Sequence, residues 1–343
     1  MLILEQAAVF FCVSAGRLMG SDSRLAKSGV YVAGHTGLAG SAVVRRLRQG
    51  GCNRLLARTH AELDLTDQTA VFQFFAEQRP DCVFLAAAKA GGILAHKMQP
   101  AEFISDNLAI QTNVIQAAHR FGAKRLLFIG SSAMYPRDCP QPIREEYLLT
   151  GPPDPAHRGY AAAKIAGLEM CWAFNRQYKT QYITVMPTNL YGPNDKYDPS
   201  TSHVLAALLR KVHEAKATGA EEVTIWGTGA PRRELLHSDD MADACVFLMN
   251  LPDDALDSLA QSEAPGPFFN LGCGEDLTIA ELAEMIVDIV GFRGRLVCDR
   301  SKPDGTMRKV LDVSWLKALG WQPRIPLREG IESVYREFLT THS

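Results

Sequence analysis

From about residue 29 onward, short apolar runs alternate with longer segments in which apolar side chains recur at helical spacing. These runs have the length of buried parallel strands, and they lie at 30–33, 54–57, 82–86, 125–129 and 182–186. Strands and helices that alternate in this way predict an α/β fold with a doubly wound parallel sheet. Beyond about residue 193 the alternation loosens and prolines and arginines gather, which predicts a smaller lobe.

A glycine-rich turn follows the first predicted strand. Gly34, Gly37 and Gly40 lie between that strand and a helical segment that starts near Ala42. This order is typical of a dinucleotide-binding unit. Gly34 would make the tight turn, Gly37 would let the backbone approach a pyrophosphate, and Gly40 would let helix and strand pack closely. The helix N-terminus would offer N–H groups to phosphates. Glycine is also common in ordinary turns. The interpretation of this motif therefore depends on the strand and helix that flank it and on residues further along the chain.

The second predicted strand ends at Arg58. A site specific for NAD usually has an acid here, which binds the ribose 2′-hydroxyl, whereas an arginine suits the 2′-phosphate of NADPH. Arg58 and Thr59 therefore favour NADPH, with Asp64 and Leu65 at the adenine end of the cofactor. The alternative is a solvated surface arginine.

Tyr160 and Lys164 are four residues apart in a predicted helix and so share one face. A lysine ammonium beside a phenol favours the phenolate and lowers the pKa of the tyrosine. We therefore expect Tyr160 to exchange a proton with a substrate oxygen near pH 7. Ser131 follows another predicted strand, at the edge where such sheets bind ligands. Taken alone, a Tyr/Lys pair is more often an exposed helix contact.

Composition narrows the possible partners. The chain has 343 residues, 47% of them hydrophobic and 22% charged, which is enough for one large or two moderate domains. A net charge of −2 without a long basic block argues against nucleic acid and anionic membranes. Eight cysteines without C-x-x-C pairs indicate reduced cytosolic thiols, so we expect a cytoplasmic protein with no metal site.

Residues 1–28 differ from the rest of the chain. The apolar run at 9–13 is too short for a membrane span, and no lysine or arginine precedes it as in a signal peptide. We expect a poorly ordered or loosely docked extension, or a true start at Met19. Residues 29–193 are expected to form a Rossmann domain to which 234–274 return, with 194–233 and 275–343 as the substrate-binding lobe.

The glycine turn, Ser131, Tyr160 and Lys164 together resemble an extended short-chain dehydrogenase/reductase. From about residue 29 to 340 the chain resembles the GDP-L-fucose synthase family, and the segments that carry this resemblance are 85–92, 176–178, 186–193, 202–204, 236–240 and 301–306. The resemblance implies conversion of GDP-4-keto-6-deoxy-D-mannose to GDP-L-fucose with NADPH, by epimerisation at C3 and C5 and reduction at C4. It also implies a homodimer formed by the helices near 101–120 and 159–178, although an apolar helix stripe is more often intramolecular core.

The resemblance implies roles for individual side chains. Ser131 and Tyr160 would hold the C4 oxygen, Lys164 would also hold the nicotinamide ribose, and His203 would be the acid of the epimerisation. Alone, His203 would be taken for a surface histidine. The positions that match the cofactor site are Gly34, His35, Thr36, Gly37, Leu38, Ala39, Gly40, Arg58, Asp64, Leu65, Ile129, Gly130, Ser131, Ser132, Lys164, Pro187, Thr188, Asn189, Leu190 and His203. The positions that match the substrate site are Lys211, Trp226, Arg233 and Asp304. Without the resemblance, Trp226 could equally be a side chain of the hydrophobic core, and Lys211 a solvated surface lysine.

Two positions depart from the family's pattern. The family reads Ser-Ser-Cys-Ile-Tyr-Pro where this chain has Ala133 in place of the cysteine, the proposed base of the epimerisation, and a methyl group cannot accept a proton. Another group, a water or Cys139 would substitute, or the protein reduces C4 without efficient epimerisation. Thr36 replaces an arginine common near the 2′-phosphate, so the NADPH preference depends on Arg58, with His35 as a helper.

Three functions therefore stay open from the sequence. The first is a bifunctional epimerase–reductase, and the second is an NADPH-dependent 4-keto-sugar reductase. The third is a nucleotide-sugar sensor without activity. Binding alone would give no reason to retain the Ser/Tyr/Lys set.

Overall fold

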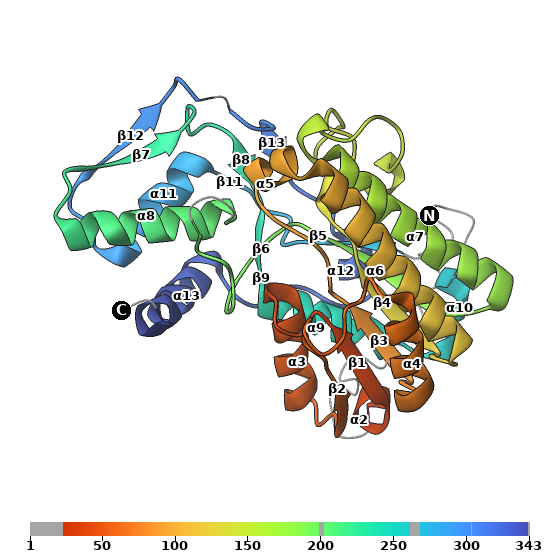
Figure 1. The fold of residues 1–343 in the computed structure, drawn as a ribbon. Coiled ribbons are helices and arrows are strands. Elements are labelled where there is room, and N and C mark those ends of the chain that lie inside the picture. The colour runs from red at the N-terminus through yellow and green to blue at the C-terminus, as the bar shows by residue number, and fades with distance from the viewer. Residues whose placement is uncertain (1–22, 199–201, 261–267, 303, 342–343) are drawn as a thin grey trace.

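A six-stranded parallel sheet forms the centre of the computed structural model, which describes residues 23–198, 202–260, 268–302 and 304–341. The strand order is β10-β5-β4-β3-β1-β2 (Figure 1). The strands are β1 (Gly29–Ala33), β2 (Arg54–Leu56), β3 (Cys82–Leu85), β4 (Arg125–Ile129), β5 (Gln181–Pro187) and β10 (Phe268–Leu271). The predicted α/β fold is confirmed.

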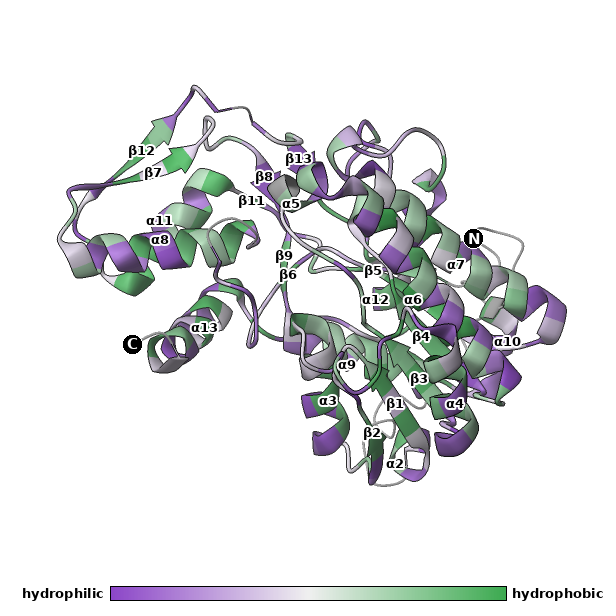
Figure 2. Ribbon diagram, viewed as in Figure 1, coloured by the Kyte–Doolittle hydropathy of each residue, from purple (hydrophilic) through white to green (hydrophobic). Residues whose placement is uncertain are grey.

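Helices cover both faces of the sheet because its strands carry apolar side chains on both sides. In β1, Val30 and Val32 belong to one core, and Tyr31 and Ala33 to the other. The first core includes α3 (Leu38–Gln49) and α9 (Ser238–Met249), and the second includes α4 (Gln68–Gln78), α6 (Pro100–Arg120) and α7 (Arg158–Tyr178). Figure 2 shows the hydrophobic strands between helices whose polar faces turn outward.

A second group of elements has a core of its own and stands apart from the sheet in Figure 1. It contains α8 (Val204–Thr218), β7 (Glu222–Trp226), α11 (Ile279–Val290), β12 (Arg295–Asp299) and α13 (Leu327–Thr341). Small sheets connect it to the rest of the chain through β6 (Asn189–Tyr191), β8 (Arg232–Arg233), β9 (Leu235–His237), β11 (Leu277–Thr278) and β13 (Arg308–Lys309).

The beginning of the described chain is ordered earlier than expected. Residues 1–22 lie outside the described residues, but α2 (Arg24–Lys27) falls inside the segment expected to be poorly ordered. Leu25 is buried in the sheet core, and Arg24 forms an ion pair with Asp253 at 2.6 Å. Residues 23–28 thus contact the sheet domain, and the rest of the extension expected at 1–28 lies outside the described residues.

Asn270 of β10 anchors the proline-rich loop that leads to α7. Its amide oxygen accepts a hydrogen bond from the Tyr135 hydroxyl at 2.6 Å, and its amide nitrogen donates to the carbonyls of Ile143 and Asp312. A fully buried amide with all these partners holds the loop against the sheet. The loop contains three short 3₁₀ turns: Ser132–Met134, Glu145–Tyr147 and Pro155–His157.

The remaining helices are short, namely α5 (Ile93–Met98), α10 (Asp253–Ala260) and α12 (Ser314–Ala318). Within the described ranges, no helix is both long and apolar enough to cross a membrane.

Candidate active site

The glycine turn after β1 forms a cradle at the N-terminus of α3. Gly34 has a φ of +84°, in the region that favours glycine, and a Cβ on Gly40 would lie 2.1 Å from the carbonyl oxygen of Gly34. Gly37 caps the helix without any side-chain hydrogen bond. A Cβ there would meet only one atom, at 3.6 Å, so space is open above the turn. The first N–H groups of α3 have no intrahelical acceptors, which makes this end an anion-binding surface.

His35 and Arg58 lie at one end of the cradle. The Nδ1 atom of His35 is buried without a hydrogen-bond partner among the described residues. The Arg58 guanidinium donates to the Ala57 carbonyl at 2.8 Å and lies 5.5 Å from the centre of the Phe74 ring. Hydrogen bonds from Thr59 lower the pKa of the exposed Glu62 carboxyl, and the charges of Arg58 and His35 lower it further. The Arg58 and His35 side chains therefore both lie near Glu62.

The two positions expected at the adenine end, Asp64 and Leu65, lie in the loop between β2 and α4. The Asp64 carboxylate accepts hydrogen bonds from the N–H and hydroxyl of Thr66, which lower its pKa, and so it is already engaged by its own turn. Leu65 is buried, and its carbonyl accepts a hydrogen bond from Asn113. The structure thus gives both residues a role in shaping the turn.

Ser131, Tyr160 and Lys164 meet at the carboxyl end of β4. Ser131 caps a 3₁₀ turn, and its hydroxyl accepts from the N–H of Ala133 at 3.1 Å and interacts with the Tyr160 phenol. Lys164 is 2% exposed and donates to the Ile129 carbonyl at 2.7 Å. Its ammonium lies 6.0 Å from the centre of the Tyr160 ring. The predicted helix brings Tyr160 and Lys164 together, because both residues belong to the first turns of α7.

The expected pKa of Tyr160 is wrong for this structure. Burial raises the pKa of the phenol to about 12, and the hydrogen bond with Ser131 offsets only part of that effect. Burial also lowers the pKa of Lys164 to about 7, so the ammonium is a weaker electrostatic partner than expected. Tyr160 is therefore protonated at neutral pH, which is the form that can donate a proton.

Residues 187–190 run from the last residue of β5 into β6, at the same edge of the sheet. The Thr188 hydroxyl and the Asn189 amide both donate to the Glu234 carbonyl, at 3.2 and 3.0 Å. The buried Glu234 carboxylate accepts from the N–H groups of Gly274 and Leu311. This network fixes the segment from Pro187 to Leu190 beside the end of β4.

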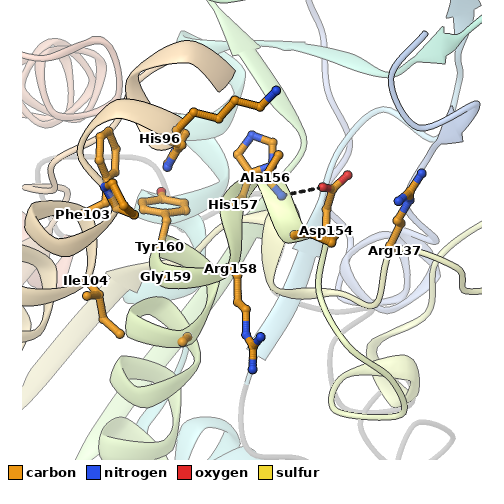
Figure 3. A pocket seen from close by; sticks show the side chains of 14 residues that line it. His96, Phe103, Ile104, Arg137, Asp154, Ala156, His157, Arg158, Gly159 and Tyr160 are labelled. Carbon is orange, nitrogen blue, oxygen red and sulfur yellow. Dashed lines mark hydrogen bonds between the residues drawn. The ribbon is translucent and has the colours of Figure 1, made fainter. Parts of the chain in front are cut away.

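Two histidines absent from the predicted site lie next to Tyr160. His96 of α5 is 6% exposed, and its ring centre lies 4.0 Å from that of Phe103, 4.8 Å from that of His157 and 5.3 Å from that of Tyr160 (Figure 3). Burial lowers the pKa of His96 to about 4 and also lowers that of His157. The one sequence signal for this pair is that His157 stands three residues before Tyr160.

His203 is exposed at the N-terminus of α8, beyond this pair. Its charge acts on both His96 and His157, so the three imidazoles share one region. Asp195 also lies in this region, since the charge of His203 opposes the rise that burial causes in its pKa. Within the described ranges, no three His, Cys, Asp or Glu side chains are grouped as metal ligands.

A cavity of about 770 Å³ adjoins Tyr160. Its wall includes His96, His157, Asp154 and Arg137, and it extends along the N-terminal turns of α6 and α7 (Figure 3). Ser131, Lys164 and His203 are not part of its wall. Of the three residues Ser131, Tyr160 and Lys164, Tyr160 is therefore the one that lines the cavity.

The four predicted substrate residues are connected through β7, the turn after it and the loop at 304–306. Trp226 is 70% exposed at the end of β7, which excludes the alternative that it is core. Nearby, Asp304 accepts hydrogen bonds from the N–H and hydroxyl of Thr228, and Lys211 donates to the Thr224 carbonyl. Arg233, paired in register with Lys309, reaches the same loop: its guanidinium donates to the Thr306 carbonyl at 2.6 Å and would lie 2.9 Å from a Cβ on Gly305, the residue after Asp304.

The chain is similar to known enzymes over most of its length. Residues 30–260 match the model of the NAD dependent epimerase/dehydratase family. A putative GDP-L-fucose synthase 2 of Arabidopsis thaliana is 53% identical over 90% of this chain and 91% of its own. The GDP-L-fucose synthase of Escherichia coli K12 is 49% identical over 92% and 98%. Among solved structures, a GDP-mannoheptose C4 reductase from Campylobacter jejuni with NADP bound is 41% identical over 91% of this chain and 98% of its own, with a TM-score of 0.81.

Proposed function

Because the chain belongs to the NAD dependent epimerase/dehydratase family, we propose that it converts GDP-4-keto-6-deoxy-D-mannose to GDP-L-fucose with NADPH. The meeting of Ser131, Tyr160 and Lys164 at the carboxyl end of β4 carries this proposal. The GDP-L-fucose synthases among its relatives support the choice of substrate.

The residues around the glycine turn fit NADPH. Three features suit phosphate groups: the open space above Gly37, the N-terminus of α3 without a side-chain cap, and the Nδ1 of His35, which has no partner among the described residues. Arg58 would bind the 2′-phosphate, and Lys164 the nicotinamide ribose. The segments 34–40, 129–132 and 187–190 would complete the site together with His203, Asp64 and Leu65. When bound, NADPH supplies the hydride that reduces C4.

The side chains beside Tyr160 suit a carbonyl substrate. A ketone at C4 acidifies the hydrogens at C3 and C5, and its oxygen becomes negative both in the enolate and during reduction. The Ser131 and Tyr160 hydroxyls would donate hydrogen bonds to that oxygen. Because the Tyr160 phenol is protonated near pH 7, it can then give its proton to the oxygen. The cationic form of Lys164 would stabilise the phenolate that this leaves.

The GDP moiety would contact the second group of elements. We propose that residues 194–233 and 275–343 form this substrate-binding lobe and that 29–193, with 234–274, form the cofactor domain. Arg233 would bind diphosphate oxygens, and the exposed ring of Trp226 would cover the sugar or nucleotide. Lys211 and Asp304 lie beside the same strand end as Trp226 and would bind polar groups of the substrate.

A second candidate function is reduction of a GDP-4-keto sugar without epimerisation. Ala133 favours it, because its methyl group cannot act as a base, and one related solved structure is that of a GDP-mannoheptose C4 reductase. Incubation with the 4-keto sugar in D₂O, with NADP⁺ in place of NADPH, separates the two. Deuterium at C3 and C5 supports the bifunctional enzyme, and its absence supports the reductase.

Steady oxidation of NADPH with GDP-4-keto-6-deoxy-D-mannose tests the whole proposal. Turnover is expected, since the Ser/Tyr/Lys set is complete. No oxidation by folded, NADPH-binding protein would contradict both candidates and leave a nucleotide-sugar sensor.

The preference for NADPH is expected to depend on Arg58. Loss of a charged hydrogen bond costs about 1.5–3 kcal/mol, so Arg58→Ala should raise the Kd of NADPH about 10- to 150-fold and leave the weaker binding of NADH unchanged. Fluorescence titration with both cofactors measures this. Arg48→Ala, at an exposed arginine of α3, is the matched control. An equal loss for both cofactors would contradict a 2′-phosphate contact.

We also propose a cytoplasmic homodimer that forms through α6 and α7. These helices pack side by side, and Tyr178 is exposed near the end of α7. Light scattering at micromolar protein should give twice the mass of the chain, and a monomer mass would contradict the dimer. The scattered cysteines support the cytoplasmic location, because those in the described residues form no disulfides.

A further inference from the structure

The proposed epimerisation needs a group that removes a proton from carbon. Ala133 lies next to Ser131, in the turn at the end of β4, and cannot serve. The inference below rests on the proposed function, and it concerns which side chain of this protein supplies the missing base.

Three groups near the site are poorly suited to this task. The Cys139 thiol packs against an apolar cluster, and burial raises its pKa, which keeps it protonated near neutral pH. Lys309 has its pKa lowered to about 8 by burial, so at pH 7 it is mostly a cation with no free electron pair. His96 is a weak base, since its pKa is about 4, and its ring is packed against Phe103.

His157 combines a place in the cavity wall with a neutral ring for which no contact with Phe103 is found in the described structure. It forms part of the cavity wall with Tyr160, and its ring contacts that of His96, which in turn contacts Tyr160 (Figure 3). Among the described residues, no side chain donates a hydrogen bond to its imidazole or accepts one from it. Burial, followed by the charge of Lys309, lowers its pKa, so the ring is neutral and can accept a proton near pH 7.

We propose that His157 is the base that removes the proton from C3 and C5 of the 4-keto sugar, in place of the thiol that Ala133 lacks. A free ring nitrogen takes the proton as the C–H bond breaks. The electron pair of that bond forms a double bond to C4, and the C4 oxygen becomes an enolate that the Ser131 and Tyr160 hydroxyls bind. A proton from His203 on the other face of the ring restores the C–H bond and the ketone. Exchange with solvent then returns both imidazoles to their starting forms.

The surroundings of His157 set the pH dependence of this step. Three groups that are positive when protonated lie near His157: His96 from α5, Lys309 from β13 and His203 before α8. The Asp154 carboxylate lies in the turn before His157, and Tyr160 follows on α7. Because the pKa of His157 is lowered, its neutral form persists at neutral pH. Exchange should therefore fall at acid pH, as His157 becomes protonated.

Deuterium exchange tests this assignment directly. In D₂O with NADP⁺ and GDP-4-keto-6-deoxy-D-mannose, His157→Gln should incorporate deuterium at C3 and C5 about a hundredfold or more slowly than the parent protein. Cys139→Ser, and His60→Gln at an exposed histidine, should exchange at the parent rate. Added imidazole should restore exchange to His157→Ala, since the adjoining cavity of about 770 Å³ can hold it. A residue that only positions Tyr160 would not respond to imidazole.

The possible results separate this inference from the proposed function. Parent-rate exchange by folded His157→Gln, or loss of exchange in Cys139→Ser instead, would overturn the role of His157 and leave the epimerase–reductase intact. No exchange by the parent protein, together with oxidation of NADPH, would overturn both the role of His157 and the epimerisation, in favour of the C4 reductase. Failure of imidazole to restore His157→Ala would also contradict a role in proton transfer.

Discussion

Replacing Tyr160 by phenylalanine is expected to lower the rate of NADPH-dependent reduction about a thousandfold, because the variant has no proton to give to the C4 oxygen. The phenol lies against the Ser131 hydroxyl, and its pKa of about 12 keeps it protonated across the neutral range. No other hydroxyl in the described structure has both this contact and the neighbouring Lys164. The measurement is kcat from NADPH oxidation with the 4-keto sugar, with NADPH affinity measured alongside.

Affinity for NADPH should stay near that of the parent protein, since the cradle of the glycine turn is untouched. Tyr178→Phe provides the matched control, because Tyr178 lies at the far end of the same helix and is exposed. A Tyr160→Phe protein that reduces the sugar at the parent rate would contradict the role of the phenol.

The second large effect is expected from Gly40→Ala. The added Cβ would lie 2.1 Å from the Gly34 oxygen and 3.0 Å from the His35 Cα, and both are backbone atoms that cannot rotate away. Helix and turn must separate, at a cost of about 1–3 kcal/mol or more. We expect a lower unfolding midpoint and a loss of NADPH affinity larger than that of Arg58→Ala, because the whole cradle shifts.

The control for this variant lies at the other end of the same helix. Gly50 has a φ of −79°, and a Cβ there would approach no atom closer than 3.5 Å. Gly50→Ala should therefore leave both stability and NADPH affinity nearly unchanged. If Gly40→Ala binds NADPH as tightly as the parent, the glycine turn is not the phosphate cradle.

Local features of the sequence predicted the parts of the site that are local in the structure. The apolar runs at 30–33 and 125–129 became β1 and β4, because a strand buried on both faces needs little beyond such a run. Tyr160 and Lys164 came together because four residues make about one helical turn. The glycine turn likewise depends on a short stretch of backbone.

Properties that depend on tertiary packing were not predicted. The raised pKa of Tyr160 comes from burial, which the side chains of distant segments create. The exposure of Trp226 depends on where β7 ends in the lobe, and the sequence left it open. His96 and His157 lie far apart in the chain, and no periodicity connects them. Asp64 matched a cofactor position, but its carboxylate is engaged by Thr66 two residues on.

An NMR assignment of the sugar made by the parent protein from GDP-4-keto-6-deoxy-D-mannose and NADPH tests most directly whether one site both epimerises and reduces. We predict GDP-L-fucose, inverted at C3 and C5 and reduced at C4, with one NADPH oxidised for each sugar formed. A product reduced at C4 that keeps the substrate's configuration at C3 and C5 would contradict the bifunctional enzyme.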